Sequence, residues 1–189
     1  MTSNKTILIL LLLATVVYPK SQSIGAFGGG LGFGYHEGER TIGCGSFVSL
    51  GYRHPTRFNI LLVEAGVTRG EFGKLFCVTD VRPQEFTTTN LTVGLSADIF
   101  RLWLFSFSTS FGFSIDYTKG TLAPGGEMQH QDYVDIKKWS DGVYLKAGIG
   151  LNIFRDRYRI SAIPINVYIG AEMAKQYPMI ELSVRIPNT

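Results

Sequence analysis

Apolar and polar residues alternate with a period of two along most of the chain. The clearest segment is 104–117. One of its faces carries Phe105, Phe107, Phe111, Phe113, Ile115 and Tyr117, and the other carries Ser106, Ser108, Ser110, Gly112, Ser114 and Asp116. Segments 91–99 and 143–153 repeat this pattern. Strict alternation is typical of a β-strand whose two faces meet different surroundings, and no long segment after Ile24 has helical spacing. The pattern predicts an all-β protein.

Five weaker segments bring the expected number of strands to eight. They are 24–36, 42–53, 58–68, 158–170 and 178–186. Pro164 falls within one of them and cannot donate to a strand ladder, so a bulge is expected there. The connections alternate between short turns and longer polar loops, of which 70–85 and 118–142 are the longest. Short turns at one end and long loops at the other predict an antiparallel, up-and-down transmembrane β-barrel with eight strands.

The polar face of the strands indicates which side of the barrel meets lipid. A soluble barrel such as a lipocalin would keep its apolar face inside and show Lys, Glu and Arg outside. Here the polar face is mostly Gly, Ser, Thr and Asn, and only 17% of the 189 residues are charged. Small residues suit the narrow interior of an eight-stranded barrel. We therefore expect the apolar face to be turned outward, toward lipid.

Aromatic residues near the strand ends are expected to form the two interfacial girdles of such a barrel. At the short-turn end they are Tyr52, Phe58, Phe100, Trp103, Phe154 and Tyr158, and at the loop end Tyr35, Tyr117, Tyr144 and Tyr177. The alternative interpretation is that these are core aromatics of an ordinary β-sandwich.

The N-terminal segment 1–23 has the three parts of a secretory signal peptide. Lys5 precedes the apolar run 7–17, and Pro19 precedes small residues at Ser21 and Ser23. The run is too short for a membrane anchor helix, which needs about 20 apolar residues. The expected organisation is a signal peptide at 1–23 and a barrel at 24–189, exported to the outer membrane of a Gram-negative bacterium.

The architecture of residues 24–189 resembles small eight-stranded outer-membrane proteins of the OmpA-barrel and OmpX type. The features that carry this resemblance are the signal peptide, the alternating strands, the unequal connections and the glycine-rich first strand 28–34 (GGGLGFG). The glycines do not fit the register of a dinucleotide-binding loop. On an inward face they would leave room for neighbouring backbones and bulky side chains.

Several charged residues fall on the inward face. They are Glu64, Asp98, Asp116, Lys146, Arg159, Glu181 and Arg185. Unpaired buried charges are very costly, so we expect a salt-bridge network that plugs the lumen, with Glu64 facing Arg185. The alternative is a narrow path for ions or water.

The sequence offers little catalytic chemistry. His36, His54 and His130 do not form a Ser-His-Asp grouping with their neighbours. His130, Asp132 and Asp135 could ligate a cation, although a polar loop carries such residues by default. We expect no enzyme activity, cofactor or metal. The mature chain has 16 basic and 15 acidic residues, a balance that excludes the basic footprint of a nucleic-acid-binding protein.

The only two cysteines, Cys44 and Cys77, are expected to meet at the loop end and form a disulfide, since export places them in an oxidising compartment. The alternative is two buried thiols. The expected partners are membrane lipids and a protein, surface or envelope component that contacts loops 70–85 and 118–142. The function expected first is therefore a non-enzymatic barrel that binds through its loops. Its alternatives are a porin-like channel for small solutes and a lipid-modifying enzyme.

Overall fold

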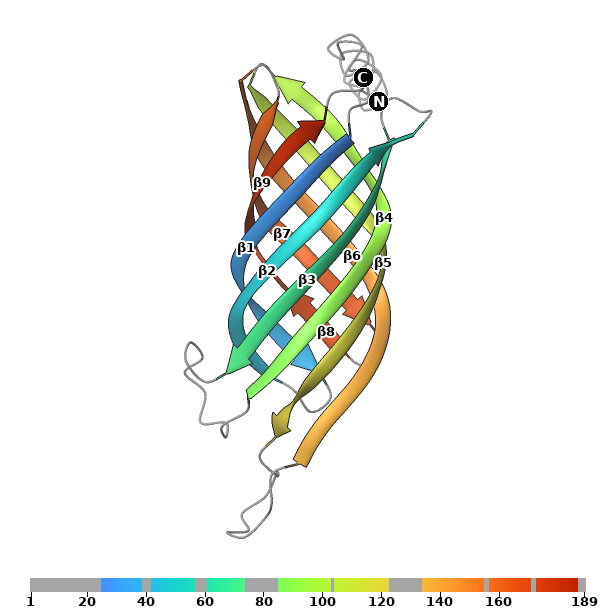
Figure 1. The fold of residues 1–189 in the computed structure, drawn as a ribbon, viewed down its shortest axis with the longest axis vertical. Helices are drawn as coiled ribbons and strands as arrows, with labels where there is room; N and C mark the ends of the chain where they lie inside the picture. Colours follow the sequence, from blue (N-terminus) through green and yellow to red (C-terminus); the bar gives the residue numbers. More distant parts are fainter. Residues whose placement is uncertain are drawn as a thin grey trace, which may run out of the picture.

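The computed structural model describes residues 25–38, 42–56, 61–73, 85–102, 104–122, 134–154, 157–170 and 173–186. These residues form nine β-strands, which wind around one barrel (Figure 1). The strands are β1 (Gly25–Gly38), β2 (Ile42–Pro55), β3 (Leu61–Gly73), β4 (Glu85–Leu102), β5 (Phe105–Leu122), β6 (Val134–Ile153), β7 (Tyr158–Gly170), β8 (Met173–Gln176) and β9 (Met179–Ile186).

Every pairing between neighbouring strands is antiparallel. The sheet closes because β1 pairs with β2 on one side and with β8 and β9 on the other. β8 and β9 occupy a single position in the barrel, between β7 and β1. They are separated only by Tyr177 and Pro178. Pro178 cannot donate a ladder hydrogen bond, whereas the N–H of Tyr177 still donates to the carbonyl of Asn166 at 2.8 Å. The nine strands thus make an eight-stranded, closed barrel, which confirms the predicted fold class.

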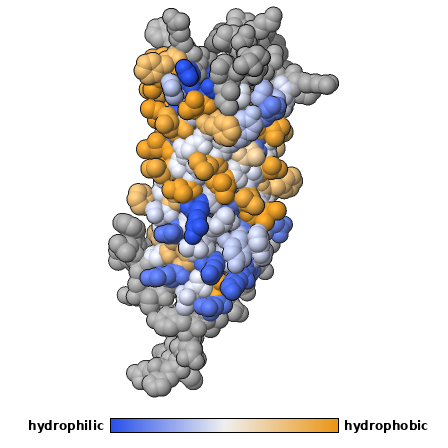
Figure 2. All heavy atoms as spheres, viewed as in Figure 1, coloured by the Kyte–Doolittle hydropathy of each residue, from blue (hydrophilic) through white to orange (hydrophobic). Residues whose placement is uncertain are grey.

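The two faces of the strands lie as the alternation predicted. On β5, Phe111 is 57% exposed and Phe113 is 72% exposed, whereas Ser110 and Ser114 are buried inside the barrel. Apolar side chains gather over the upper part of the molecule, and charged ones gather toward the lower end (Figure 2). A surface that exposes so many large apolar side chains is stable in lipid rather than in water. No helix among the described residues is long and apolar enough to cross a membrane.

The predicted bulge lies at Pro164. Ala147 pairs with Ile165, and Ile149 pairs with Ala162, so β7 carries one more residue than β6 across this interval. The extra residue lets Pro164 sit in the barrel wall without donating a ladder hydrogen bond, and the prediction is confirmed.

Three of the predicted loops are wrong in their bounds. The expected loop 70–85 is strand as far as Gly73 and again from Glu85, and the expected loop 118–142 is strand to Leu122 and again from Val134. The connection expected at 171–177, between the strands 158–170 and 178–186, contains β8. The physical reason is that β-pairing continues beyond the apolar band of the barrel. The outward face carries charged residues there, among them Glu71, Lys119 and Lys137, so the apolar outward face that marks a lipid-facing strand disappears.

The expected aromatic girdle at the loop end is partly wrong. Tyr35 is exposed on the outer surface, but Tyr144 and Tyr177 are buried in the lumen. Tyr144 belongs to the inward face of its strand, and Tyr177 lies at the break before β9. Phe58, Trp103 and the signal-peptide segment 1–23 lie outside the described residues.

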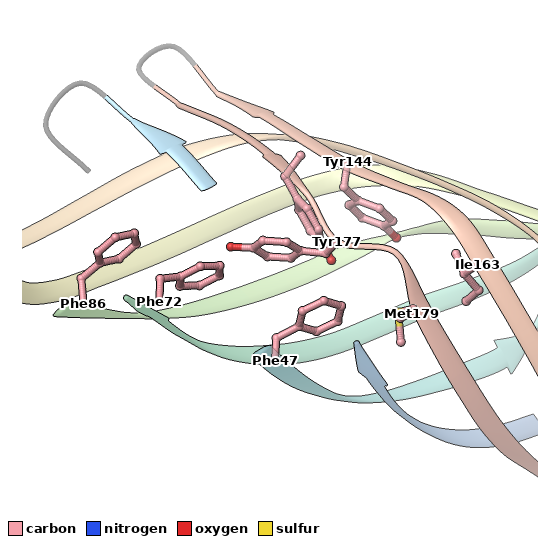
Figure 3. Packing of buried hydrophobic residues seen from close by; sticks show 8 residues of the cluster. Phe47, Phe72, Phe86, Tyr144, Ile163, Tyr177 and Met179 are labelled. Atoms are coloured by element: carbon pink, nitrogen blue, oxygen red, sulfur yellow. The ribbon is translucent and has the colours of Figure 1, made fainter. Parts of the chain in front are cut away.

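Bulky side chains fill the loop-side half of the lumen (Figure 3). This aromatic cluster consists of Phe47, Phe72, Phe86, Tyr144, Ile163, Tyr168, Tyr177 and Met179. The glycines of β1 make room for it: a Cβ on Gly30 would lie 2.0 Å from the Met179 side chain, and one on Gly34 would lie 2.4 Å from the Tyr177 ring. The inward glycines therefore act as the sequence predicted.

Candidate functional site

In the lumen near the short-turn end, the carboxylate of Asp98 lies between two arginines. Both terminal nitrogens of Arg159 contact Asp98, with Nη1–Oδ1 at 2.8 Å and Nη2–Oδ2 at 2.5 Å. Arg185 reaches the same carboxylate at 3.7 Å. Asn152 accepts a further hydrogen bond from Arg159 Nε at 2.9 Å, which holds the guanidinium in place. This fork-to-fork geometry is the strongest arrangement available to an Arg–carboxylate pair.

Glu64 is the centre of a second group of charges. Its Oε1 accepts from Lys146 Nζ at 2.6 Å, and its Oε2 accepts from Arg53 Nε at 3.1 Å and from the Ser110 hydroxyl at 2.9 Å. Arg53 also reaches Glu181, with Nη2 at 3.0 Å from Oε1 and 3.2 Å from Oε2. Arg53 and Glu64 are cross-strand neighbours on β2 and β3, whereas Lys146 comes from β6 and Ser110 from β5. The bonds of Glu64 to Lys146 and Ser110 therefore cross the lumen.

A third pair lies deeper toward the loop end. Lys175 on β8 and Asp116 on β5 form an ion pair in which both side chains are fully buried. His36 on β1 is the strand neighbour of Lys175. It is itself buried against the rings of Phe72 and Phe86, at centroid distances of 5.5 and 4.9 Å. At the loop end, the lumen therefore contains the Lys175–Asp116 ion pair next to a group of packed aromatic rings.

All seven charges that alternation placed in the lumen point inward, but their partners differ from the expectation. Glu64 pairs with Lys146 and Arg53, and Arg185 lies against Asp98, so the expected pair of Glu64 with Arg185 is wrong. The register and tilt of the strands decide which inward residues lie at the same height along the barrel axis. Alternation carries no information about register or tilt.

Sequence reasoning missed two lumen cations, Arg53 and Lys175. Arg53 lies on the inward face of β2. It could have been found by extending the alternation to the last residues of that strand. Lys175 belongs to β8, which has only four residues and ends at the break before Pro178. No periodicity is visible over so short a strand.

The charges around Glu64 line a small cavity in the lumen. A cavity of about 20 Å³ lies among residues that include Arg53, Glu64, Lys146 and Glu181. A single water needs about 10–15 Å³ by this measure. On the loop side, the aromatic cluster narrows the lumen further: Phe47 stacks on Tyr177 at 4.8 Å, and Phe72 on Phe86 at 5.2 Å.

The other candidate groups do not assemble into a reactive centre within the described ranges. His54 lies at the short-turn end, with Nδ1 at 3.2 Å from the Tyr52 hydroxyl. No cluster of three or more His, Cys, Asp or Glu residues suited to a metal occurs among the residues that the structure describes. His130, Asp132 and Cys77 lie outside them, so the expected Cys44–Cys77 disulfide stays a prediction.

Strands β4, β5 and β6 reach beyond the rest of the barrel at its loop end, the lower end in Figure 1. Tyr117 and Trp139 are cross-strand neighbours on the outer face, with ring centroids 4.8 Å apart. Beyond them come Lys119 and Lys137, also directly opposite each other. Stacked aromatics followed by charges are typical of the point where a barrel strand leaves the membrane.

A groove of about 690 Å³ lies at the same end, across β2 to β5. Charged residues of both signs line it, namely Arg69, Glu71, Glu85 and Lys119. Cys44 also lines it, as do Gly73 and Glu85, which flank the segment 74–84 that contains Cys77. A groove of mixed charge outside the apolar band is suited to polar contacts rather than to lipid.

Solved structures with the same fold are small outer-membrane barrels. Neisserial surface protein A has a TM-score of 0.65 and 10% identity, over 86% of this chain and 97% of that chain. Ail, the attachment invasion locus protein of Yersinia pestis, has a TM-score of 0.58 and 13% identity, over 88% and 100%. OprG of Pseudomonas aeruginosa has a TM-score of 0.50 and 8% identity, over 90% and 100%.

No family model matches the chain, and no curated protein matches it by sequence. The structural likeness therefore identifies the fold: this chain is a small eight-stranded β-barrel of the outer-membrane type. That result agrees with the outward apolar face and confirms the resemblance drawn from the strand pattern.

Proposed function

We propose that this protein is a non-enzymatic barrel of the Gram-negative outer membrane, closed inside by its own side chains, which contacts a partner, surface or envelope component at its loop end. The filled lumen is the observation that carries this proposal. The ion pairs Lys146–Glu64 and Arg159–Asp98 span the interior, and the cavity beside Glu64 and Lys146 is about 20 Å³. A hydrated ion needs considerably more room than one water.

The loop end is the part of the molecule that can contact a partner outside the membrane. β4, β5 and β6 have 18, 18 and 20 residues, whereas about 9 to 11 tilted residues cross the hydrocarbon core. The surplus projects outside the membrane. Among the structural neighbours, Ail is named for attachment and invasion, and it has been solved in complex with the heparin analogue sucrose octasulfate. Contact through the outer end is consistent with that precedent.

Conductance in planar bilayers tests the closed lumen. We expect the purified full chain to give no steady current steps. A variant with Glu64→Ala and Tyr177→Ala removes the centre of one charge group and a ring of the aromatic cluster, and it serves as the widened control. Steady, reproducible conductance from the unmodified chain would contradict the proposal and favour the channel alternative. A change in the lipid composition of cells that carry the protein would favour the enzyme alternative.

The signal peptide belongs to the same proposal, because an outer-membrane barrel must first be exported. Cleavage after Ser23 would give a mature chain that begins at Ile24. N-terminal sequencing of protein isolated from the outer-membrane fraction tests this point. An N-terminus at Met1 in that fraction would contradict cleavage.

A further inference from the structure

Several buried polar atoms in the lumen have no hydrogen-bond partner among the residues that the structure describes. Asn90 on β4 is completely buried, and neither its Nδ2 nor its Oδ1 has such a partner. The same holds for the hydroxyls of Ser114 and Tyr144 and for Oδ2 of Asp116. A buried polar atom that gives up water without a replacement is costly, and native proteins contain few of them. These atoms therefore indicate that another group satisfies them.

The four side chains lie close together on the barrel wall, and we call them the polar stripe. Asn90 and Asp116 are direct cross-strand neighbours, and Ser114 lies one inward row nearer to the short-turn end. The ring of Tyr144 (Figure 3) reaches across to β4, where a Cβ added to Gly94 would lie 2.6 Å from its hydroxyl oxygen. The polar stripe thus follows the inner face of two neighbouring strands.

The barrel wall is thin beside the polar stripe. One inward row, on β3 to β6, carries no side chain larger than threonine; its members are Gly66, Thr92, Ser114 and Gly142. The cavity of about 20 Å³ beside Glu64 extends to Gly66 and Thr92 of this row. A site of that size can hold a water molecule when two or more polar groups face it.

The chemistry of the polar stripe indicates what would satisfy it. Asn90 Nδ2 and the hydroxyls of Ser114 and Tyr144 can donate hydrogen bonds. Asn90 Oδ1 and the ionised carboxylate of Asp116 can only accept them. A ligand that serves both kinds of atom must itself donate and accept, and it must be small. Water meets these requirements.

A metal ion does not fit the same place. At the loop end of the polar stripe, Lys175 forms an ion pair with Asp116. At the other end, Lys146 Nζ lies 5.1 Å from the centre of the Tyr144 ring. Both ammonium groups would repel a cation placed between them, and the donors of the polar stripe would have no partner.

We propose that the polar stripe binds a small cluster of internal water molecules, held between the Lys175–Asp116 ion pair and the cavity beside Glu64. These waters complete the hydrogen bonds of Asn90, Ser114 and Tyr144 and solvate the second oxygen of the Asp116 carboxylate. A lumen that is closed to ions can be either dry or hydrated, so this inference goes beyond the proposed function.

Nuclear magnetic resonance of the full chain in phospholipid nanodiscs tests the proposal, with water itself as the probe. Bound internal waters give cross-peaks to nearby amide protons, and the sign of the rotating-frame cross-peak separates them from chemical exchange. We expect water cross-peaks at the side-chain amide of Asn90. The side-chain amide of Asn152 should give none, because it is equally enclosed but donates to the carbonyl of Leu104 and accepts from Arg159.

Replacing Asn90 by leucine gives a second, independent readout. Leucine has nearly the same shape and no polar atom. In a dry lumen, Asn90→Leu would remove an unsatisfied amide and raise the urea midpoint of unfolding. We expect the midpoint to fall instead, because leucine displaces waters that also satisfy Ser114 and Asp116. Asn152→Leu is the matched control and should lower the midpoint, since it removes an amide that has protein partners at both ends.

Absence of a water cross-peak at Asn90, or a urea midpoint of Asn90→Leu equal to or above that of the parent, would overturn the proposal. If Asn90→Leu does not fold, the cross-peak in the unmodified chain decides alone. Trapped waters carry no steady ion current. The conductance test is therefore unaffected by these results, and the proposed function stands or falls separately.

Discussion

Lys175 and Asp116 form an ion pair inside the barrel, although 59 residues separate them in the chain and neither side chain reaches solvent. Each charge is tolerated because the other is present: an unpaired charge in a low-dielectric interior is far more costly than a paired one. Barrel closure brings the two together, since β8 completes the wall between β7 and β1.

Replacing one partner of this pair should strongly destabilise the barrel. We expect Lys175→Met or Asp116→Val alone to lower the free energy of unfolding by about 3–5 kcal/mol, and the double variant to recover much of that loss. Urea titration, followed by the separation of folded and unfolded bands on unboiled gels, measures the change. Lys119→Met, on the exposed outer rim, is the control and should change stability by about 0.5 kcal/mol or less. Single variants as stable as the parent would contradict the pair.

The partners of Glu64 can be assigned with double-mutant cycles. Because Lys146 contacts Glu64 directly, the cycle of Glu64→Gln with Lys146→Met should give a coupling free energy of about 1–3 kcal/mol. The cycle of Glu64→Gln with Arg185→Met should be additive to within about 0.5 kcal/mol, since Arg185 lies against Asp98 instead. The reverse ranking of the two cycles would favour the pair that alternation alone suggested.

Two glycines of the barrel wall should respond differently to alanine. A Cβ on Gly32 would lie 2.1 Å from the carbonyl oxygen of Pro178, which is backbone and cannot move aside easily. A Cβ on Gly51 would have its nearest neighbour at 3.5 Å. We expect Gly32→Ala to cost about 1–3 kcal/mol by overpacking, and Gly51→Ala to be neutral or slightly stabilising. Equal stabilities of the two variants in urea titrations would contradict the claim that the close approach of Gly32 to Pro178 excludes a Cβ.

The disulfide between Cys44 and Cys77 remains a prediction. Cys44 lies in the groove at the loop end, and the segment that contains Cys77 starts and ends beside it, at Gly73 and Glu85. A bond closing a loop of about 30 residues should stabilise the barrel by roughly 3–4 kcal/mol. Mass spectrometry of non-reduced protein from membranes should find no alkylatable thiol. Two alkylated cysteines in that sample would exclude the bond.

The sequence predicted the faces of the strands better than their ends or their partners. Phe111 and Ser110 were placed correctly, because lipid outside and a narrow polar lumen inside impose opposite demands on neighbouring residues. The segment 134–141 was assigned to a loop, because its outward face carries Asp135 and Lys137 and lacks the run of apolar side chains that marks a lipid-facing strand.

The candidate site was only partly predictable for a related reason. Alternation shows that Glu64 points inward, but not that Lys146 and Arg53 lie at the same height along the barrel axis. That depends on a register that builds up over several strands. Lys175 could not be placed because the Tyr177–Pro178 break leaves β8 too short to show a period.

The lipid-facing band supports a comparison between two outward arginines, one at mid-depth and one at the loop end. Phe111→Arg should impair folding into lipid by about 2–4 kcal/mol if the residue lies near the midplane, whereas Thr87→Arg, outward but at the loop end, should cost about 0–1 kcal/mol. Folding yields in phospholipid vesicles at graded urea concentrations give both values. Equal costs for the two variants would mean that the apolar band does not mark the membrane.

The most direct test of the account is the environment of consecutive residues along β5. Single spin labels are placed from 105 to 117 in a background with Cys44→Ser and Cys77→Ser, and the protein is reconstituted in phospholipid bilayers. We expect accessibility to dissolved oxygen to alternate with a period of two, high at Phe107, Phe111 and Phe113 and low at the serines between them. A water-soluble nickel reagent should reach neither set near the middle of the strand. Nickel accessibility at Phe111 and Phe113, equal to that of a label on the outer rim at Thr121, would contradict a lipid-facing barrel.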